Sequence, residues 1–84
     1  MLYLPVRELP DGARVAERLR TTDNRVALLA FTALDRLADS CGLSQAWSVV
    51  ELISLDQLQA EQPFDLVAFD REIPQALLVG GRLA

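Results

Sequence analysis

The sequence predicts a small α+β domain of α/β-like order, with one mixed sheet of about five strands and two helices packed on it. Apolar residues recur at every second position in several short runs, which is the period of a half-buried strand. Between these runs they recur three or four positions apart, which is the period of a helix face. The chain has 84 residues, of which 51% are hydrophobic, so a single domain with one core is expected over residues 1–84.

The N-terminal part of the chain predicts a strand followed by an antiparallel hairpin. Apolar residues alternate along residues 2–6, and a Pro-Asp-Gly turn follows at residues 10–12. Residues 14–22 fit the period of a helix and that of a strand. The two residues 23–24 form a connection that accepts positive φ and lead into the apolar run 26–31, so the hairpin is the simpler interpretation.

A first helix is expected directly after this apolar run. Asp35 follows Thr32 by three positions, a weak form of the capping box, so Thr32 is expected to cap the helix and Asp35 to support the cap. Apolar residues at positions 34, 37, 38 and 41 then form one stripe, and Gly42 supplies the left-handed residue that ends the helix.

The second half of the chain predicts another strand, helix and strand. Residues 47–53 are rich in β-forming side chains, and Ser54 repeats the capping pattern for a shorter helix that Pro63 ends. Residues 66–69 are a continuous apolar run, typical of a strand covered on both faces. Strands joined through a helix run parallel, so this unit extends the sheet with parallel strands. The tail, residues 73–84, is expected either to dock as a short helix or strand or to fray.

The composition argues against an active site. The chain contains no histidine and no lysine, so neither the commonest general base nor an alternative base for a serine or for Cys41 is present. Asp65 and Asp70 bracket a strand and lie too far apart to share a metal, while Asp35 and Asp39 form only a weak exposed pair. No glycine-rich loop opens a helix. We therefore expect no enzyme, no catalytic or metal-binding residue and no cofactor.

Charge and hydropathy indicate which cellular compartment and which classes of partner to expect. The net charge of −4 argues against a nucleic-acid partner. No run approaches the roughly 20 apolar residues of a membrane helix, and Pro5 and Arg7 interrupt what a signal peptide would need. A cytoplasmic protein without membrane contact is expected. Cys41 has no second cysteine to pair with and lies on the helix stripe, so it is expected to pack as a small hydrophobic residue.

Two arginines of the expected hairpin are candidates for an interaction surface. Arg18 and Arg20 lie on one face of a strand, where they could contact phosphates or an acidic protein. Glu17 and Asp23 interleave with them, so a solvated hairpin face is the alternative.

Three apolar residues are further candidates. Trp47 is either a partner anchor or, at the head of a strand, a core residue. Leu77 and Leu78 belong to a terminal segment so apolar that it needs a surface to cover, either its own sheet or that of a neighbour.

Several segments resemble a group of small SseB-like actinobacterial proteins: LYLPVRE, RVALLAFTALDRL, W-x-V before the second helix, and PFDLVAFD. These proteins are similar to the N-terminal domain of SseB, the enhanced serine sensitivity protein. The resemblance covers roughly residues 2–72, and its most specific part runs from Ala30 through Thr32 to Leu37. It implies an SseB-N-like fold of uncharacterised activity and carries over no catalytic or cofactor-binding residue.

Together these patterns predict a non-enzymatic interaction module, either a homodimer or an accessory subunit of an unknown protein. Residues 43–84 carry six acidic residues against two arginines, so they could face the arginine hairpin of another copy. The alternative is a small-molecule-binding regulatory domain linked to amino-acid metabolism, which depends on the resemblance alone. The residues themselves give no reason to expect a small-molecule ligand.

Overall fold

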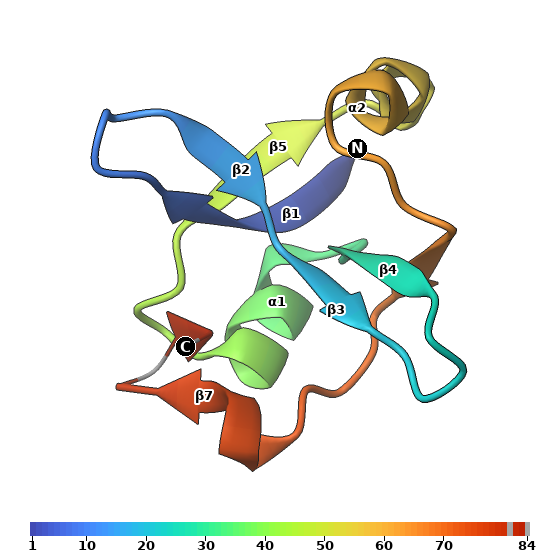
Figure 1. The fold of residues 1–84 in the computed structure, drawn as a ribbon. Helices are drawn as coiled ribbons and strands as arrows, with labels where there is room; N and C mark the ends of the chain where they lie inside the picture. Colours follow the sequence, from blue (N-terminus) through green and yellow to red (C-terminus); the bar gives the residue numbers. More distant parts are fainter. Residues whose placement is uncertain (81, 84) are drawn as a thin grey trace.

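The computed structural model describes residues 1–80, 82 and 83, and the predicted tail thus includes two positions, 81 and 84, that lie outside the described residues. The described chain is a small α+β domain, as predicted (Figure 1). The predicted single sheet of about five strands is wrong, because the described strands form three small sheets.

The elements are short and follow one another closely. The strands are β1 Leu2–Glu8, β2 Arg14–Ala16, β3 Arg18–Arg20, β4 Val26–Ala30, β5 Trp47–Val50, β6 Leu66–Phe69, β7 Leu78–Val79 and β8 Arg82–Leu83. The helices are α1 Leu34–Cys41 and α2 Leu55–Glu61, with 3-10 turns η1 Leu52–Ser54 and η2 Gln75–Leu77.

The first two sheets have three strands each, in the orders β2-β1-β5 and β3-β4-β6. The expected hairpin is confirmed, since β3 and β4 pair antiparallel and Asn24 in their connection has a φ of 66°. The expected parallel pairing through a helix holds for β4 and β6. It fails for β5, which pairs antiparallel with β1.

The chain divides into separate sheets because β2 pairs with β1, whereas its continuation β3 pairs with β4. Figure 1 shows β2 running on into β3, and Glu17 stands between them. The Glu17 N–H donates to the Pro5 carbonyl of β1 at 2.8 Å, whereas its carbonyl accepts from the Leu29 N–H of β4 at 3.3 Å. β4 thus has β3 on one side and β6 on the other, so the strand that follows α1 pairs with the free side of β1.

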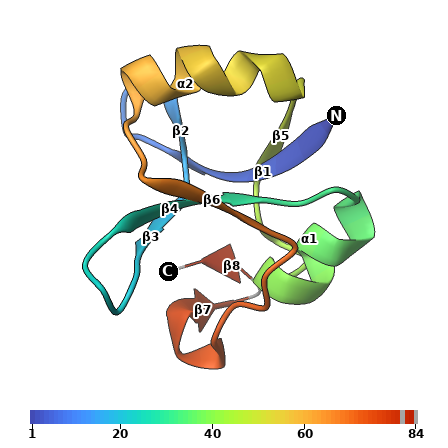
Figure 2. The ribbon, with the colours of Figure 1, turned by 90° about the vertical axis from the view of Figure 1, so that its right-hand side faces the viewer.

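The two faces of β4 lie in two separate core clusters. Leu29 and the following Phe31 pack with Leu37 and Cys41 of α1 and with the tail, while Leu28 and Ala30 pack toward α2. This division follows from the period of two along a strand. Figure 2 accordingly shows α2 on one side of the strands and α1 with the tail on the other.

The tail docks on its own domain. Ile73 and Leu83 are buried in the same cluster as Leu37, with exposed fractions of 5% and 8%. The described part of the tail forms η2 and the antiparallel pair β7–β8.

The predicted cap of α1 is wrong. The helix begins at Leu34, and the residue before it, Ala33, makes no side-chain capping bond. Thr32 instead donates its hydroxyl to Asp70 Oδ2 at 2.7 Å, and among the described residues the Asp35 carboxylate accepts only from the neighbouring Arg36 N–H. Ser54 likewise makes no side-chain capping bond at α2. The Thr32 hydroxyl bonds to a carboxylate because β6, which Asp70 follows, ends beside the end of β4.

Two carboxylates fasten the ends of β6 to β4. At one end, Asp65 Oδ2 accepts from the Val26 N–H at 2.7 Å. At the other end, Asp70 accepts from the Thr32 N–H at 2.8 Å and from Arg36 Nη1 at 2.9 Å. Asp70 adopts a φ of 52°, a conformation uncommon for a residue with a Cβ, which turns the chain away after the strand. Both carboxylates thus bracket β6 as expected, Asp65 by bonding to β4 and Asp70 by bonding to Thr32 after β4 and to Arg36 of α1.

These contacts predict an acid-sensitive element of stability. The Thr32 hydroxyl, then the Thr32 N–H and Arg36, hold the pKa of Asp70 below its ordinary value of 3.8. In acid the unfolded chain therefore takes up this proton first, so the contribution of Asp70 is present above about pH 4 and is lost as pH falls through its folded-state pKa. We expect Asp70→Asn to lower stability at neutral pH and to flatten the loss below pH 4. Urea unfolding across this range measures both, with Asp39→Asn as a control at an exposed carboxylate of α1. An equal loss of stability below pH 4 in the wild type and in Asp70→Asn would contradict the assignment of this loss to Asp70.

Candidate functional site

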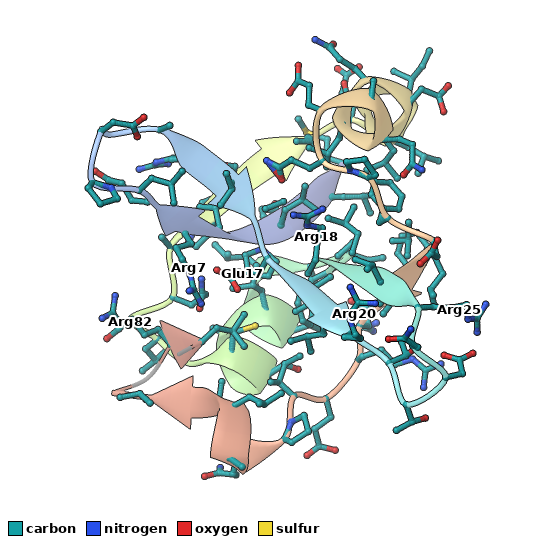
Figure 3. The ribbon with its side chains drawn as sticks, viewed as in Figure 1. Arg7, Glu17, Arg18, Arg20, Arg25 and Arg82 are labelled. Carbon is teal, nitrogen blue, oxygen red and sulfur yellow. The ribbon has the colours of Figure 1, made fainter. Side chains whose placement is uncertain are left out.

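Arginines from three separate segments gather on one side of the molecule. Figure 3 shows Arg7 of β1, Arg82 of β8 and the three arginines of β3 and the hairpin, with Glu17 among them. Arg7, Glu17 and Arg82 line the same small hollow. The structure therefore places the predicted Arg18 and Arg20 in a wider basic surface.

These arginines differ in how their charges are compensated. Arg7 Nε donates to Glu17 Oε1 at 2.8 Å, and Arg25 Nε donates to Asp23 Oδ2 at 2.7 Å, so both are paired with carboxylates. Arg18 is held by a neutral group, because its Nη1 donates to the Pro63 carbonyl at 2.8 Å.

Arg20 is held in the same way as Arg18. Its Nη1 donates to the backbone carbonyl and to the side-chain Oδ1 of Asn24, both at 3.1 Å. Among the described residues, neither Arg18 nor Arg20 has a carboxylate partner. Two fixed guanidinium groups with uncompensated charge thus stand two residues apart on β3.

A groove runs beside these arginines. It has a volume of about 440 Å³ and is lined by residues 15–20, together with Arg7 and Val26. Its wall is the edge of the continuous β2–β3 strand, so a ligand in it would contact the backbone and the arginine side chains together.

Trp47 lies on the surface of β5, so its interpretation as a core residue is wrong. Its side chain is 40% exposed and meets the Tyr3 ring edge-on, with centroids 5.7 Å apart. Val49, on the same face of the strand, is 39% exposed. β5 is the outer strand of its sheet and contains no charged residue.

The backbone of β5 presents unpaired groups at its outer edge. Tyr3, opposite Val49, exchanges both of its backbone hydrogen bonds with Phe31, at 2.8 and 2.9 Å. Pro5, opposite Trp47, has no N–H and its carbonyl accepts from Glu17. Since alternate residues of an antiparallel pair bond to the partner, the N–H and C=O groups of Trp47 and Val49 point away from β1. No other backbone bond to either residue occurs in the described part of the chain.

The two predicted tail residues have different environments. Leu77 is 40% exposed, whereas Leu78 is half-buried against the core cluster that contains Ile73. The five predicted residues lie on β3, on β5 and in the tail, and no hydrogen bond or ring contact joins these three groups within the described residues.

A second hollow lies on the α1 side of the β3-β4-β6 sheet. Its volume is about 500 Å³, and residues 71–73 form one of its walls. Leu29, Ala68 and Phe69 contribute to an apolar lining. Ligand pockets have volumes of roughly 300 to 1,000 Å³, so the size fits a small molecule.

Cys41 has the properties of a core residue, as predicted. Its side chain is fully buried beside Phe31 and Leu37. Burial, together with the nearby negative charge of Glu17, raises the pKa of the Cys41 thiol to about 11. The thiolate, which is the nucleophilic form, is therefore scarce at neutral pH.

The described residues contain no group of three or more His, Cys, Asp or Glu side chains placed to hold a metal ion. Within the same residues, no helix has the length and apolar content that a bilayer crossing requires.

No family model, curated protein or solved structure matches this chain. The resemblance to SseB-like proteins stays a prediction. The geometry of the two strand edges is therefore what the functional proposals depend on.

Sequence reasoning missed three residues that shape these surfaces. Arg7 and Arg82 join the basic surface from opposite ends of the chain, and no local pattern marks them. Val49 shares the exposed face of β5 with Trp47, and its spacing of two from Trp47 was a usable signal.

Proposed function

We propose that this chain is a non-enzymatic interaction module that self-associates by pairing β5 with β5 of a second copy. The observation that carries the proposal is the outward-facing backbone of Trp47 and Val49 on an uncharged edge strand. An exposed edge of this kind is a template for another strand. Self-association also extends the modest core that a domain of 84 residues forms alone.

One antiparallel register fits β5 best. With Ser48 opposite Ser48 of the second copy, Trp47 stands opposite the second Val49, and Val49 opposite the second Trp47. Because these are the residues with outward backbone groups, each of the two pairs exchanges two hydrogen bonds. The result is a twofold dimer with a sheet continuous across both copies.

The side chains favour the same register. Trp47 and the opposing Val49 share one face of the joined sheet, and aromatic residues paired with β-branched ones contribute roughly 0.2 to 1 kcal/mol per pair. Neither copy places a charge opposite a like charge within β5, whose sequence is Trp-Ser-Val-Val.

The other outer strands of the two three-stranded sheets carry features that disfavour self-pairing. β3 carries Arg18 and Arg20, and like charges on paired edges repel. On β2, the Ala16 N–H is already bonded to Gln62 Oε1 at 2.8 Å. β6 is bracketed by Asp65 and Asp70.

Sedimentation velocity over a range of concentrations tests the proposal. We expect the wild type to dimerise and Val49→Lys to weaken the dimer at least about tenfold, because both Trp47–Val49 pairs are lost and a lysine on an edge strand disfavours pairing with another strand. Leu43→Lys is the matched control, since Leu43 is 93% exposed and lies in the connection before β5.

Amide hydrogen exchange gives a second readout that needs no variant. The N–H groups of Trp47 and Val49 should become protected as concentration rises. A wild type that stays monomeric in low and high salt, or unprotected amides at these positions in a dimer, would refute the β5 interface. Association only with a different protein through β5 would instead identify an accessory subunit.

In this proposal the domain acts in the cytoplasm, where Cys41 stays a thiol. A small-molecule-binding regulatory domain linked to amino-acid metabolism is the second candidate. It is favoured by the apolar hollow of about 500 Å³ next to β6 and by the resemblance to SseB-like proteins. A thermal-shift screen with amino acids separates the two, since a ligand that binds the folded state stabilises it by RT ln(1 + [L]/Kd).

A further inference from the structure

We infer that the groove beside β2 and β3 binds an extended acidic segment of another protein, whose alternate carboxylates meet Arg18 and Arg20. This inference concerns a different strand edge from the one used for self-association. It therefore stands whether or not β5 forms a dimer.

Both arginines have donors left for a carboxylate ligand. Each is anchored through a single Nη1 to neutral oxygens, of Pro63 for Arg18 and of Asn24 for Arg20. Within the described part of the chain the remaining N–H donors of each guanidinium are available, and bidentate pairing with a carboxylate is the interaction that this group makes best. Because the anchoring bonds already restrict both side chains, less conformational entropy is lost on binding.

The spacing of the two arginines matches that of an extended peptide. Two residues along a strand span roughly 6.6 Å, so Arg18 and Arg20 project from the same face at that interval. An extended peptide with acidic residues at alternate positions has the same interval. A segment of that pattern laid along β3 brings successive carboxylates to successive arginines.

The backbone of the groove wall presents hydrogen-bonding groups to a peptide. The Leu29 N–H bonds to the Glu17 carbonyl, and the Thr21 N–H bonds to the Arg25 carbonyl, so the odd-numbered residues of this strand face β4. The backbone groups of Arg18 and Arg20 consequently face away from β4, beside the groove. A peptide strand can bond to them, which a ligand without backbone amides cannot do.

Two neighbouring groups shape the site: Gln62 limits the free edge at one end, and Glu17 lines the groove. The Gln62 side chain bonds to the Ala16 N–H, so the free edge begins after Ala16. Glu17 lines the groove, but its side chain is only 10% exposed and its carboxylate is paired with Arg7, which limits its repulsion of an acidic ligand. The site thus offers a short positive edge that begins after Ala16 and includes Arg18 and Arg20.

These features favour an acidic protein segment over two other ligands. A nucleic acid would meet a chain with a net charge of −4 and would leave the strand edge unpaired. The acidic residues of α2 in a second copy lie on a helix, so they lack the strand spacing.

Fluorescence anisotropy with two labelled peptides of identical composition tests the inference. One peptide alternates the residues, Glu-Val-Glu-Val-Glu, and the other groups them, Glu-Glu-Glu-Val-Val. We expect the alternating peptide to bind more tightly and Arg18→Gln and Arg20→Gln each to weaken it at least about tenfold. Arg71→Gln removes the same charge at an exposed position outside the groove and should leave binding within about twofold. Circular dichroism melts verify that each variant is folded.

Four results would overturn the inference. Absence of binding to the wild type is the first, and equal affinity for the two peptides, which would mean that spacing is not recognised, is the second. An equal loss in Arg71→Gln would show that only net charge matters. Tighter binding of a single-stranded oligothymidylate of the same charge would assign the groove to nucleic acid.

Discussion

Replacing Phe31 with alanine is expected to lower the free energy of unfolding by about 3 to 5 kcal/mol, the range for large-to-small changes at a buried aromatic residue. Phe31 has an exposed fraction of 0% and packs with Leu37 and Cys41 of α1 and with Ile73 of the tail. Its backbone also links β4 to Tyr3 of β1. The substitution therefore leaves a cavity where both three-stranded sheets, α1 and the tail meet. Urea unfolding followed by circular dichroism measures the loss.

Phe69→Ala is the matched control for this cavity. Phe69 ends β6 opposite Ala30 and is 45% exposed, so the same change of side chain should cost about 1 kcal/mol or less. Similar losses in the two variants would show that Phe31 does not occupy the centre of the fold.

Local patterns were enough to predict most individual elements. The stripe of apolar residues from Leu34 to Cys41 predicted α1, because a short amphipathic helix buries one face wherever it docks. The hairpin through Asn24 and the strand Leu66–Phe69 also followed from turn chemistry and from short apolar runs. Each of these signals lies within about ten residues of sequence.

The assembly of the sheets could not be predicted in the same way. β5 looked like the next strand of the β4 sheet, but both sides of β4 were already occupied, by β3 and β6. This competition involves residues far apart in the chain, and hydrophobic period alone does not encode it. The reassignment of Thr32 from helix cap to partner of Asp70 has the same cause, since the two residues are 38 positions apart.

The candidate surfaces show the same limit. Arg18 and Arg20 were predicted on one face because their spacing is local. Their lack of carboxylate partners depends on where Pro63 and Asn24 come to lie, and the uncharged edge of β5 depends on Tyr3 bonding to Phe31. Whether a strand edge is free depends on the segments packed beside it, and the sequence of the strand alone does not specify those segments.

Gln45 connects three segments through its buried amide, although no sequence pattern singled it out. Its side chain is 7% exposed, and Nε2 donates to the Val6 carbonyl at 3.0 Å and to the Ala46 carbonyl at 2.9 Å. Its Oε1 accepts from the Leu83 N–H at 2.7 Å. The amide therefore joins β1, the start of β5 and the docked tail.

We expect Gln45→Leu to lower the free energy of unfolding by about 2 to 4 kcal/mol, because the buried Leu83 N–H and Val6 carbonyl lose this partner at nearly constant side-chain volume, whereas the Ala46 carbonyl keeps its bond from the Val6 N–H. Gln57→Leu, at an exposed position of α2, is the control and should change stability by about 0.5 kcal/mol or less. Amide exchange then separates two causes of tail docking. If the Leu83 N–H loses protection in Gln45→Leu while Leu28 keeps it, the amide bond holds the tail. If Leu83 stays protected, burial of Ile73 and Leu83 alone is sufficient, and the stability loss belongs to the β1–β5 end of the first sheet.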